Sequence, residues 1–193
     1  MAPLRVGVIF EETQLSDLIG IDLIGNCGKP LISCMTEFGY PDLVSKAYDI
    51  EFLYISSSLD AAITTPGVRV LPTHTYDNAP RNLDIILVGG PHPKHRPAAS
   101  LKFFREAVKE SKVILSVCTG SMWLAASGIL DGKKATTNRF FIPAAKKLYP
   151  EVEWLDQRWV VDESTSAAGE GGGRGGAHLW IAGAADCGKS VSS

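Results

Sequence analysis

Three almost uninterrupted runs of apolar residues constrain the fold of this chain more than any other feature. They span residues 4–10 (LRVGVIF), 84–88 (DIILV) and 112–117 (KVILSV). A strand with one side facing solvent alternates apolar and polar residues, whereas a strand inside a parallel sheet is covered on both faces and shows little alternation. These runs therefore predict central strands of a mostly parallel sheet.

The segment between the second and third runs has the spacing of an amphipathic helix. Residues 100–110 carry apolar side chains at helical intervals, at Leu101, Phe104, Ala107 and Val108. A strand, a helix and a strand in succession form a right-handed crossover, and such units build an open sheet with helices on both faces. Further expected elements are strands at 50–55, 67–71 and 134–137 and helices at 119–127 and 142–148. The fold class is therefore α/β, and chemistry is expected at the carboxyl ends of the strands.

Composition and charge argue against several classes of partner. A chain of 193 residues with 45% hydrophobic and 21% charged residues fits one compact soluble domain. Its 19 basic and 21 acidic residues are dispersed and give a net charge of -2, so we expect neither nucleic acid nor a membrane as partner. The apolar stretch in residues 1–10 is too short for a signal peptide, which predicts a cytoplasmic protein.

The four cysteines lie far apart in the chain, at Cys27, Cys34, Cys118 and Cys187. None has the CxxC spacing or the nearby histidine pair of a zinc site, and their distribution does not predict a disulfide framework. Reduced thiols are expected, with no metal and no cofactor.

Cys118 stands at the predicted junction of strand 112–117 and helix 119–127. The backbone N–H groups and the positive end of the helix dipole at such a junction lower the pKa of a thiol and favour the thiolate nucleophile. The small residues Thr119, Gly120 and Ser121 permit the tight turn that exposes a nucleophile. The alternative is a buried, unreactive cysteine, and the spacing by itself leaves both open.

Two other loops follow predicted strands at the same edge of the sheet. Gly89 and Gly90, directly after strand 84–88, offer backbone N–H groups for an oxyanion hole, or simply form a turn. Asp17, shortly after strand 4–10, is a candidate proton donor or acceptor for the thiol; alternatively, it caps a helix. Sequence spacing does not separate these interpretations.

Residues 116–138 read SVCTGSMWLAASGILDGKKATTN. This stretch resembles the nucleophile-elbow signature of the ThiJ/PfpI superfamily and, within it, the isocyanide hydratase branch. Three other segments resemble that branch, namely residues 14–20 (QLSDLIG), the turn at 89–91 (GGP) and a late strand at 158–162 (RWVVD). The resemblance covers residues 4–162.

The resemblance implies a flavodoxin-like α/β sandwich, usually a homodimer, that acts on a small molecule without a cofactor. It assigns Cys118 as the nucleophile and Asp17 as its acid/base partner, and it places Gly20, Gly89 and Gly90 at substrate-binding positions. Protease-like and many glyoxalase-like branches carry histidine directly after the cysteine, where this chain has Thr119. Threonine can only hydrogen-bond at neutral pH, and hydratase-like members have it at this catalytic position. Thr119 therefore favours the hydratase branch.

The function that this resemblance implies is a hydratase that adds water to an isocyanide and yields an N-formyl amine. One alternative is a glyoxalase-like or deglycase enzyme acting on 2-oxoaldehydes. Another is a ligand-sensing protein without catalysis, since related domains also serve in transcription regulators.

The last part of the chain departs from that family, which has a long amphipathic helix there. Residues 164–176 contain six glycines and no large apolar residue, which predicts a flexible loop, and residues 177–185 are expected to form one short helix. We therefore divide the chain into a domain at 1–162 and a glycine-rich, divergent tail at 163–193. The tail either completes the same domain or frays from it, and it leaves an inactive protein as an alternative.

His92 and His95 lie in a proline-interrupted segment, where no helix presents both rings to one metal ion. Both are expected to be surface-loop histidines, and the alternative is that one of them lines the mouth of the pocket. Trp154 and Trp159 are expected to pack in the core.

Overall fold

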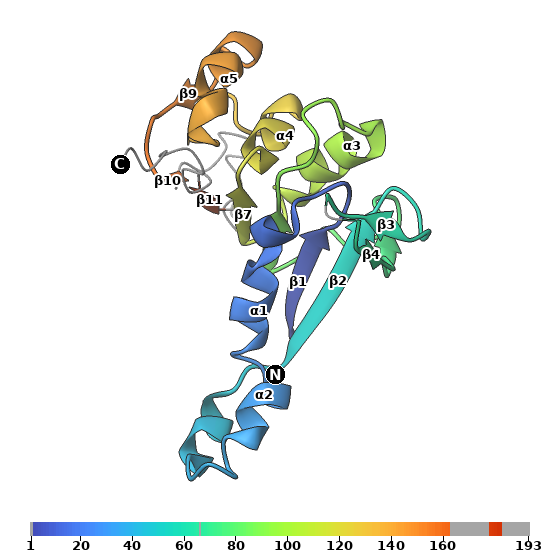
Figure 1. The fold of residues 1–193 in the computed structure, drawn as a ribbon, viewed down its shortest axis with the longest axis vertical. Helices are drawn as coiled ribbons and strands as arrows, with labels where there is room; N and C mark the ends of the chain where they lie inside the picture. Colours follow the sequence, from blue (N-terminus) through green and yellow to red (C-terminus); the bar gives the residue numbers. More distant parts are fainter. Residues whose placement is uncertain (1, 66, 163–177, 183–193) are drawn as a thin grey trace, which may run out of the picture.

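The computed structural model describes residues 2–65, 67–162 and 178–182 (Figure 1). Within these residues, the centre of the fold is a seven-stranded sheet in the order β10-β11-β7-β6-β1-β2-β5. In that order the strands are β10 (Trp159–Asp162), β11 (His178–Ala182), β7 (Val113–Val117), β6 (Ile85–Val88), β1 (Leu4–Ile9), β2 (Ile50–Ser56) and β5 (His74–Thr75). All neighbours pair in parallel except β10 and β11, which are antiparallel.

The three apolar runs form neighbouring strands in the middle of this sheet, as predicted. β6 lies between β1 and β7, with Val6 opposite Ile85 and Ile86 opposite Ile114. Val6, Ile86 and Ile114 are fully buried, although Val6 belongs to the core on one face of the sheet and the other two to the core on the opposite face. Coverage on both faces explains why these runs show no alternation.

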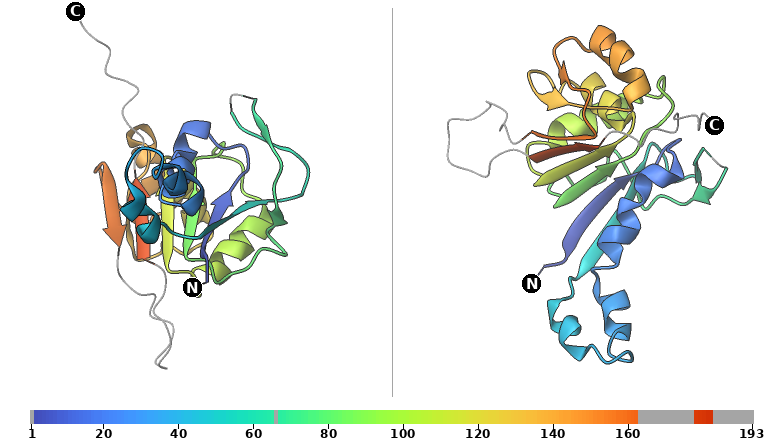
Figure 2. Two further views of the ribbon diagram at one scale, coloured as in Figure 1. Left: turned by 90° about the horizontal axis from the view of Figure 1, so that it is seen from below. Right: turned by 60° about the vertical axis from the view of Figure 1, so that its left-hand side comes forward.

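Helices cover both faces of the sheet (Figure 2). The helices are α1 (Gly20–Gly25), α2 (Lys29–Cys34), α3 (Ala98–Ala107), α4 (Gly120–Ala126) and α5 (Ile142–Leu148), with 3-10 helices η1 (Leu15–Leu18), η2 (Pro41–Lys46) and η3 (Arg139–Phe141). Residues of η1 and α1 pack on the smaller core cluster, whereas α3, α4 and α5 bury the larger one, including Phe104 and Trp123. The predicted α/β fold, with a mostly parallel sheet between two helical layers, is therefore confirmed. No helix in the described part of the chain has the length and apolar character that a membrane crossing needs.

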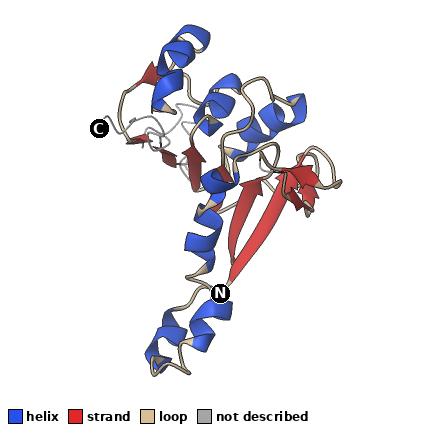
Figure 3. Cartoon of the chain, viewed as in Figure 1, coloured by secondary structure: helices blue, strands red, loops and turns tan. Residues whose placement is uncertain are grey.

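Several short elements lie outside these layers. α2 and η2 extend beyond the end of the sheet at which β1 and β2 begin (Figures 1 and 3). β3 (Ala62–Ile63) pairs with β4 (Arg69–Val70), and β8 (Lys134–Ala135) pairs with β9 (Glu153–Trp154). The short strand expected at 67–71 thus occurs as β4, but in a separate two-stranded sheet.

The helix expected at 177–185 is wrong for the described part of that segment. Residues 178–182 form β11, which lies between β10 and β7 and pairs with both. Leu179 and Ile181 are buried in the larger core cluster, and their spacing of two is typical of a strand. Pairing with two neighbours, which the local sequence does not reveal, decides the structure here. The loop expected at 164–176 lies outside the described residues.

β11 also bears on how the chain is divided. It pairs in parallel with β7, the strand that leads to Cys118. We therefore propose that the described part of the tail, residues 178–182, belongs to the same domain as residues 1–162.

Candidate active site

The carboxyl ends of β1, β6 and β7 bring together the main predicted site residues. Cys118 directly follows β7, Gly90 lies in the turn after β6, and Asp17 lies in η1 after β1. The Gly90 N–H donates to Asp17 Oδ2 over 3.0 Å, and the Asp17 carboxyl lies near enough to the Cys118 thiol for its charge to act on it. Thr119 Oγ1 donates to the Pro91 carbonyl over 3.1 Å, which ties the segment after β7 to the turn after β6.

Asp17 does not cap a helix. It lies inside η1, and the cap position before that helix belongs to Gln14. The Asp17 side chain is buried and accepts its backbone hydrogen bond from Gly90 in a neighbouring loop. The capping interpretation is therefore wrong. Because the Gly90 N–H donates to Asp17, Gly90 helps to hold the Asp17 carboxyl in place. The oxyanion role expected of Gly89 and Gly90 stays a prediction.

The backbone at Cys118 has the strained conformation of a nucleophile elbow. Its φ is 56°, in a region that residues with a side chain rarely adopt. Hydrogen bonds on both sides hold the strained residue: the Cys118 N–H donates to the Ala182 carbonyl over 3.0 Å. The Cys118 carbonyl accepts from Thr137 Oγ1 over 3.0 Å and from Ser121 Oγ over 3.2 Å. Strain supported in this way is typical of functional positions.

Gly90 allows the turn after β6 to approach the elbow closely. A Cβ atom at this position would lie 2.6 Å from Thr119 Oγ1 and 2.9 Å from Asp17 Oδ2. Both distances are shorter than van der Waals contact, so any side chain would push the turn away from Asp17 and Thr119. The absence of a side chain at Gly90 is therefore a condition for the Gly90–Asp17 hydrogen bond.

Burial dominates the protonation of the Asp17–Cys118 pair. Burial raises the pKa of the Asp17 carboxyl, although hydrogen bonds from Gly90 and Cys118 oppose the shift. Burial also raises the pKa of the Cys118 thiol, and the nearby Asp17 charge raises it further, while the Thr119 N–H, the Asn138 amide and the Thr119 hydroxyl lower it. The expected lowering of the thiol pKa is therefore wrong, because the N–H groups of the elbow are outweighed by lost hydration and an adjacent carboxylate. Because both pKa values are raised, the Asp17–Cys118 pair tends to retain a proton as the pH rises.

Asn138 is a site residue that the sequence reasoning did not single out. Its Nδ2 lies 3.9 Å from Cys118 Sγ. Its Oδ1 accepts from the Phe140 N–H over 3.0 Å, so the amide oxygen is engaged and the amide nitrogen faces the sulfur. The signal available in the sequence was an asparagine directly after the strand predicted at 134–137. Its partner is 20 residues away along the chain, so only the fold shows the contact.

An apolar cavity of about 340 Å³ lies between α1 and the sheet, and neither Cys118 nor Asp17 is part of its lining. Gly20 and Leu23 of α1 line it on one side, and Val117 and Trp159 line it from the sheet. Gly20, a predicted substrate-binding residue, therefore lies at a cavity wall. Val117, which also lines the cavity, directly precedes Cys118 in the chain.

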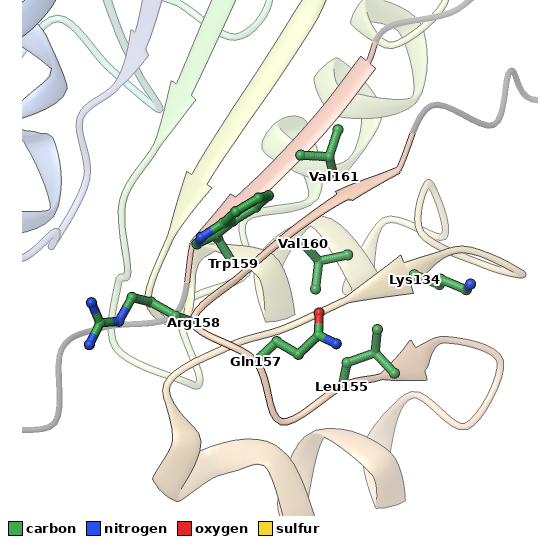
Figure 4. A pocket seen from close by; sticks show the side chains of 7 residues that line it. All are labelled: Lys134, Leu155, Gln157, Arg158, Trp159, Val160 and Val161. Atoms are coloured by element: carbon green, nitrogen blue, oxygen red, sulfur yellow. The ribbon is translucent and has the colours of Figure 1, made fainter.

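A second cavity, of about 470 Å³, lies near the edge of the sheet between β8 and β10 (Figure 4). Its lining includes Lys134, Gln157 and Arg158 but none of the predicted site residues. In Figure 4 the Arg158 side chain extends away from the other labelled side chains. Trp159 also borders this cavity and is 62% exposed, so its expected core position is wrong, whereas Trp154 is buried as expected.

Among the described side chains, no other thiol or histidine forms a hydrogen bond or ion pair with Cys118, Asp17 or Asn138. Cys27 and Cys34 are free, and Cys187 lies outside the described residues. His92 is exposed, as expected of a surface-loop residue, but His95 is partly buried. Across residues 2–65, 67–162 and 178–182, no three His, Cys, Asp or Glu side chains gather where they could hold a metal ion.

Comparison with curated proteins finds two kinds of relative. The isonitrile hydratase of Pseudomonas putida is 30% identical over 112 residues, which are 56% of this chain and 49% of that protein. The HTH-type transcriptional regulator GbdR of Pseudomonas aeruginosa is 26% identical over 106 residues, or 53% of this chain and 29% of the regulator. The matches thus span half or less of the length of these relatives.

Solved structures share the fold of the whole described chain. A ThiJ/PfpI family protein from Pseudomonas syringae has a TM-score of 0.66 and 21% identity, with coverage of 95% of this chain and 64% of its own. Schizosaccharomyces pombe DJ-1 has a TM-score of 0.62 and 13% identity, with coverage of 93% and 83%. The DJ-1/PfpI family model matches residues 35–173. The chain therefore belongs to the DJ-1/PfpI family.

Proposed function

We propose that this protein is a cofactor-independent hydratase that adds water to an isocyanide and releases an N-formyl amine. The observation that carries the proposal is the Cys118 thiol on a strained elbow, with the buried Asp17 carboxyl near enough for its charge to act on the thiol. The similarity to isonitrile hydratase supports this choice of reaction. Thr119 in place of a basic side chain after the cysteine leaves Asp17 as the proton partner.

The proposed first step forms a bond between Cys118 Sγ and the terminal carbon of the isocyanide. Because the thiol keeps its proton near neutral pH, Asp17 accepts that proton as the bond forms and then delivers it to the same carbon. The product is a thioimidate on Cys118. The Asn138 amide and the Thr119 N–H stabilise developing negative charge on the sulfur.

In the second step, water adds to the thioimidate carbon and one water proton moves to the nitrogen. The carbon–sulfur bond then breaks, the carbonyl of the N-formyl amine forms, and the remaining proton returns to the Asp17–Cys118 pair. The atoms balance as one isocyanide plus one water, and no cofactor takes part. Asp17 thus acts first as a base and then as an acid, a dual role for which a raised carboxyl pKa is suited.

The substrate test compares two small molecules with the full chain. We expect an aromatic isocyanide to be converted to the N-formyl amine, detected by the formyl proton in NMR, and methylglyoxal to be left unchanged. Conversion of methylglyoxal alone would support the glyoxalase-like alternative. Binding of the isocyanide in a thermal-shift assay without turnover would instead support ligand sensing, the alternative that the similarity to a transcriptional regulator favours.

The pH dependence of thiol alkylation tests the protonation that this mechanism requires. Because the pKa of Cys118 is raised, its thiolate forms at a higher pH than that of an ordinary thiol. We expect iodoacetamide to modify Cys118 slowly at neutral pH and to reach its full rate only above the ordinary thiol range. Mass-mapped labelling at a series of pH values measures this, with the exposed Cys27 as internal reference. A full rate at neutral pH would contradict a protonated Cys118.

The apolar cavity provides a place for the substituent of the isocyanide. Replacing Leu23, which lines the cavity and is 65% exposed, with aspartate removes apolar contact and adds a charge. We expect KM for an aromatic isocyanide to rise about tenfold with kcat little changed, since a lost contact of about 1.4 kcal/mol corresponds to that factor. Leu31→Asp, on α2 and outside the cavity lining, is the matched control. Equal effects of the two variants would exclude the cavity from substrate binding.

The resemblance to this family also leads us to propose a cytoplasmic homodimer that binds neither nucleic acid nor membranes. Sedimentation of the purified chain over a range of concentrations tests the dimer.

A further inference from the structure

A second buried carboxylate lies at the same edge of the sheet, outside the proposed mechanism. Glu11, two residues after β1, is 6% exposed and accepts hydrogen bonds from three parts of the chain. Ser56 Oγ and the Ser57 N–H donate to Oε1 at the end of β2, and Tyr76 Oη donates to Oε2 over 3.0 Å. His95 Nε2 lies 3.0 Å from the same Oε2. Hydrogen bonds from this many donors hold the buried Glu11 side chain in one position.

His95 is held on both sides of its ring. Its Nδ1 lies 3.6 Å from the Glu12 carboxylate, while Nε2 contacts Glu11. Each ring nitrogen thus faces one carboxyl group. The ring also packs against Trp123 of α4 in a T-shaped arrangement, with the ring centres 5.7 Å apart. Glu12 has a φ of 47°, and such a strained conformation persists only where surrounding contacts support it.

The segment that carries His95 begins at the proposed active site. Its Pro91 carbonyl accepts from Thr119 Oγ1, and the preceding Gly90 N–H donates to Asp17. Within the segment, the His95 N–H donates to the His92 carbonyl over 2.8 Å. The segment is thus bound to Asp17 and Thr119 at its start and to Glu11 four residues later. Movement of His95 would therefore be transmitted to the Gly90–Pro91 turn.

We propose that His95, clamped between Glu11 and Glu12, is a positioning residue that keeps the Gly90–Pro91 turn against Asp17 and Thr119. The proposal rests on the proposed function in that it concerns the geometry of the same Cys118 site. It assigns no chemical step to His95. Glu11 provides the fixed contact, and the segment from Gly90 to His95 is the part of the chain that this contact holds in place.

Three variants separate positioning from mere stability. His95→Ala removes both carboxylate contacts, whereas His95→Gln keeps a side-chain amide that donates to Glu11. Tyr76→Phe removes a different hydrogen bond from the same carboxylate, and the Tyr76 side chain forms no hydrogen bond with residues 90–95, so this variant is the matched control. Thermal melting of each variant establishes that it is folded.

The readouts are the pH profile of Cys118 alkylation and the kinetics with an aromatic isocyanide. When the turn shifts in His95→Ala, Asp17 is no longer held against the thiol, so we expect the alkylation profile to move to lower pH. We also expect kcat to fall by about 10- to 100-fold with KM little changed, the range for misplaced catalytic groups. His95→Gln should restore most of the wild-type profile and kcat, and Tyr76→Phe should keep both.

A folded His95→Ala protein with the wild-type alkylation profile would overturn the proposal, whatever its melting temperature. An equal shift in Tyr76→Phe would also overturn it, because the effect would then arise from Glu11 without the loop. The alkylation profile needs no isocyanide turnover. If the wild-type protein does not hydrate isocyanides, that result rejects the proposed function, and the profile still decides the role of His95.

Discussion

Replacement of Cys118 with serine should lower kcat/KM for the isocyanide by at least about 10,000-fold, because a hydroxyl lacks the nucleophilicity on which covalent catalysis depends. Serine retains the shape of the side chain and can form hydrogen bonds with Asp17 and Asn138. Serine would take the same strained backbone conformation that cysteine has at position 118, with a φ of 56°. We therefore expect the variant to fold. Steady-state formation of the N-formyl amine, with melting temperature as a check of folding, measures the effect.

The control for this substitution is Cys27→Ser, which removes an exposed thiol outside the site and should leave turnover unchanged. Rapid quenching and intact-mass measurement should also detect a thioimidate adduct on the wild-type protein but not on Cys118→Ser. Substantial turnover by folded Cys118→Ser protein would remove the nucleophile from the mechanism. It would also leave the strained elbow without a catalytic explanation.

Asp17→Asn should have two opposite effects on the reactivity of the site. Asparagine retains an oxygen that can accept from the Gly90 N–H but cannot exchange a proton, so turnover should fall by about 100-fold or more. At the same time, the Asp17 charge that raises the pKa of Cys118 is removed. Iodoacetamide should therefore modify Cys118 faster at neutral pH than in the wild-type protein. A slower enzyme with a more reactive thiol is difficult to explain by loss of structure.

The stability of Asp17→Asn as a function of pH provides an independent check. The pKa of Asp17 is raised in the folded state, so the folded protein binds this proton more tightly than the unfolded chain. The resulting stabilisation is present below the unfolded pKa and is lost as pH rises through the folded pKa. Relative to the wild-type protein, Asp17→Asn should therefore gain stability as pH rises through this range. Wild-type turnover in a folded Asp17→Asn protein would leave Cys118 without an identified proton partner.

The sheet and the main site residues followed from local patterns in the sequence. A strand covered on both faces requires a continuous apolar run, and the runs at 4–10, 84–88 and 112–117 became β1, β6 and β7. Because carboxyl ends of neighbouring parallel strands meet at one edge, the loops after these strands had to lie close together. The sequence therefore predicts that Asp17, Gly90 and Cys118 lie close together, as they do in the structure.

Tertiary structure alone decided the properties that depend on burial and on partners distant in the chain. Residues 178–182 form a strand because β7 and β10 leave a position between them that only an extended segment can fill. The direction of the Cys118 pKa depends on how much water the folded site excludes and on the distance to Asp17, neither of which local sequence specifies. The contact of Asn138 with the thiol and the clamp of Glu11 and Glu12 on His95 join residues 20 and more than 80 positions apart. Sequence patterns thus determine which elements form, because they reflect local backbone and burial preferences, whereas the charge state and fine geometry of the site arise only when those elements pack together.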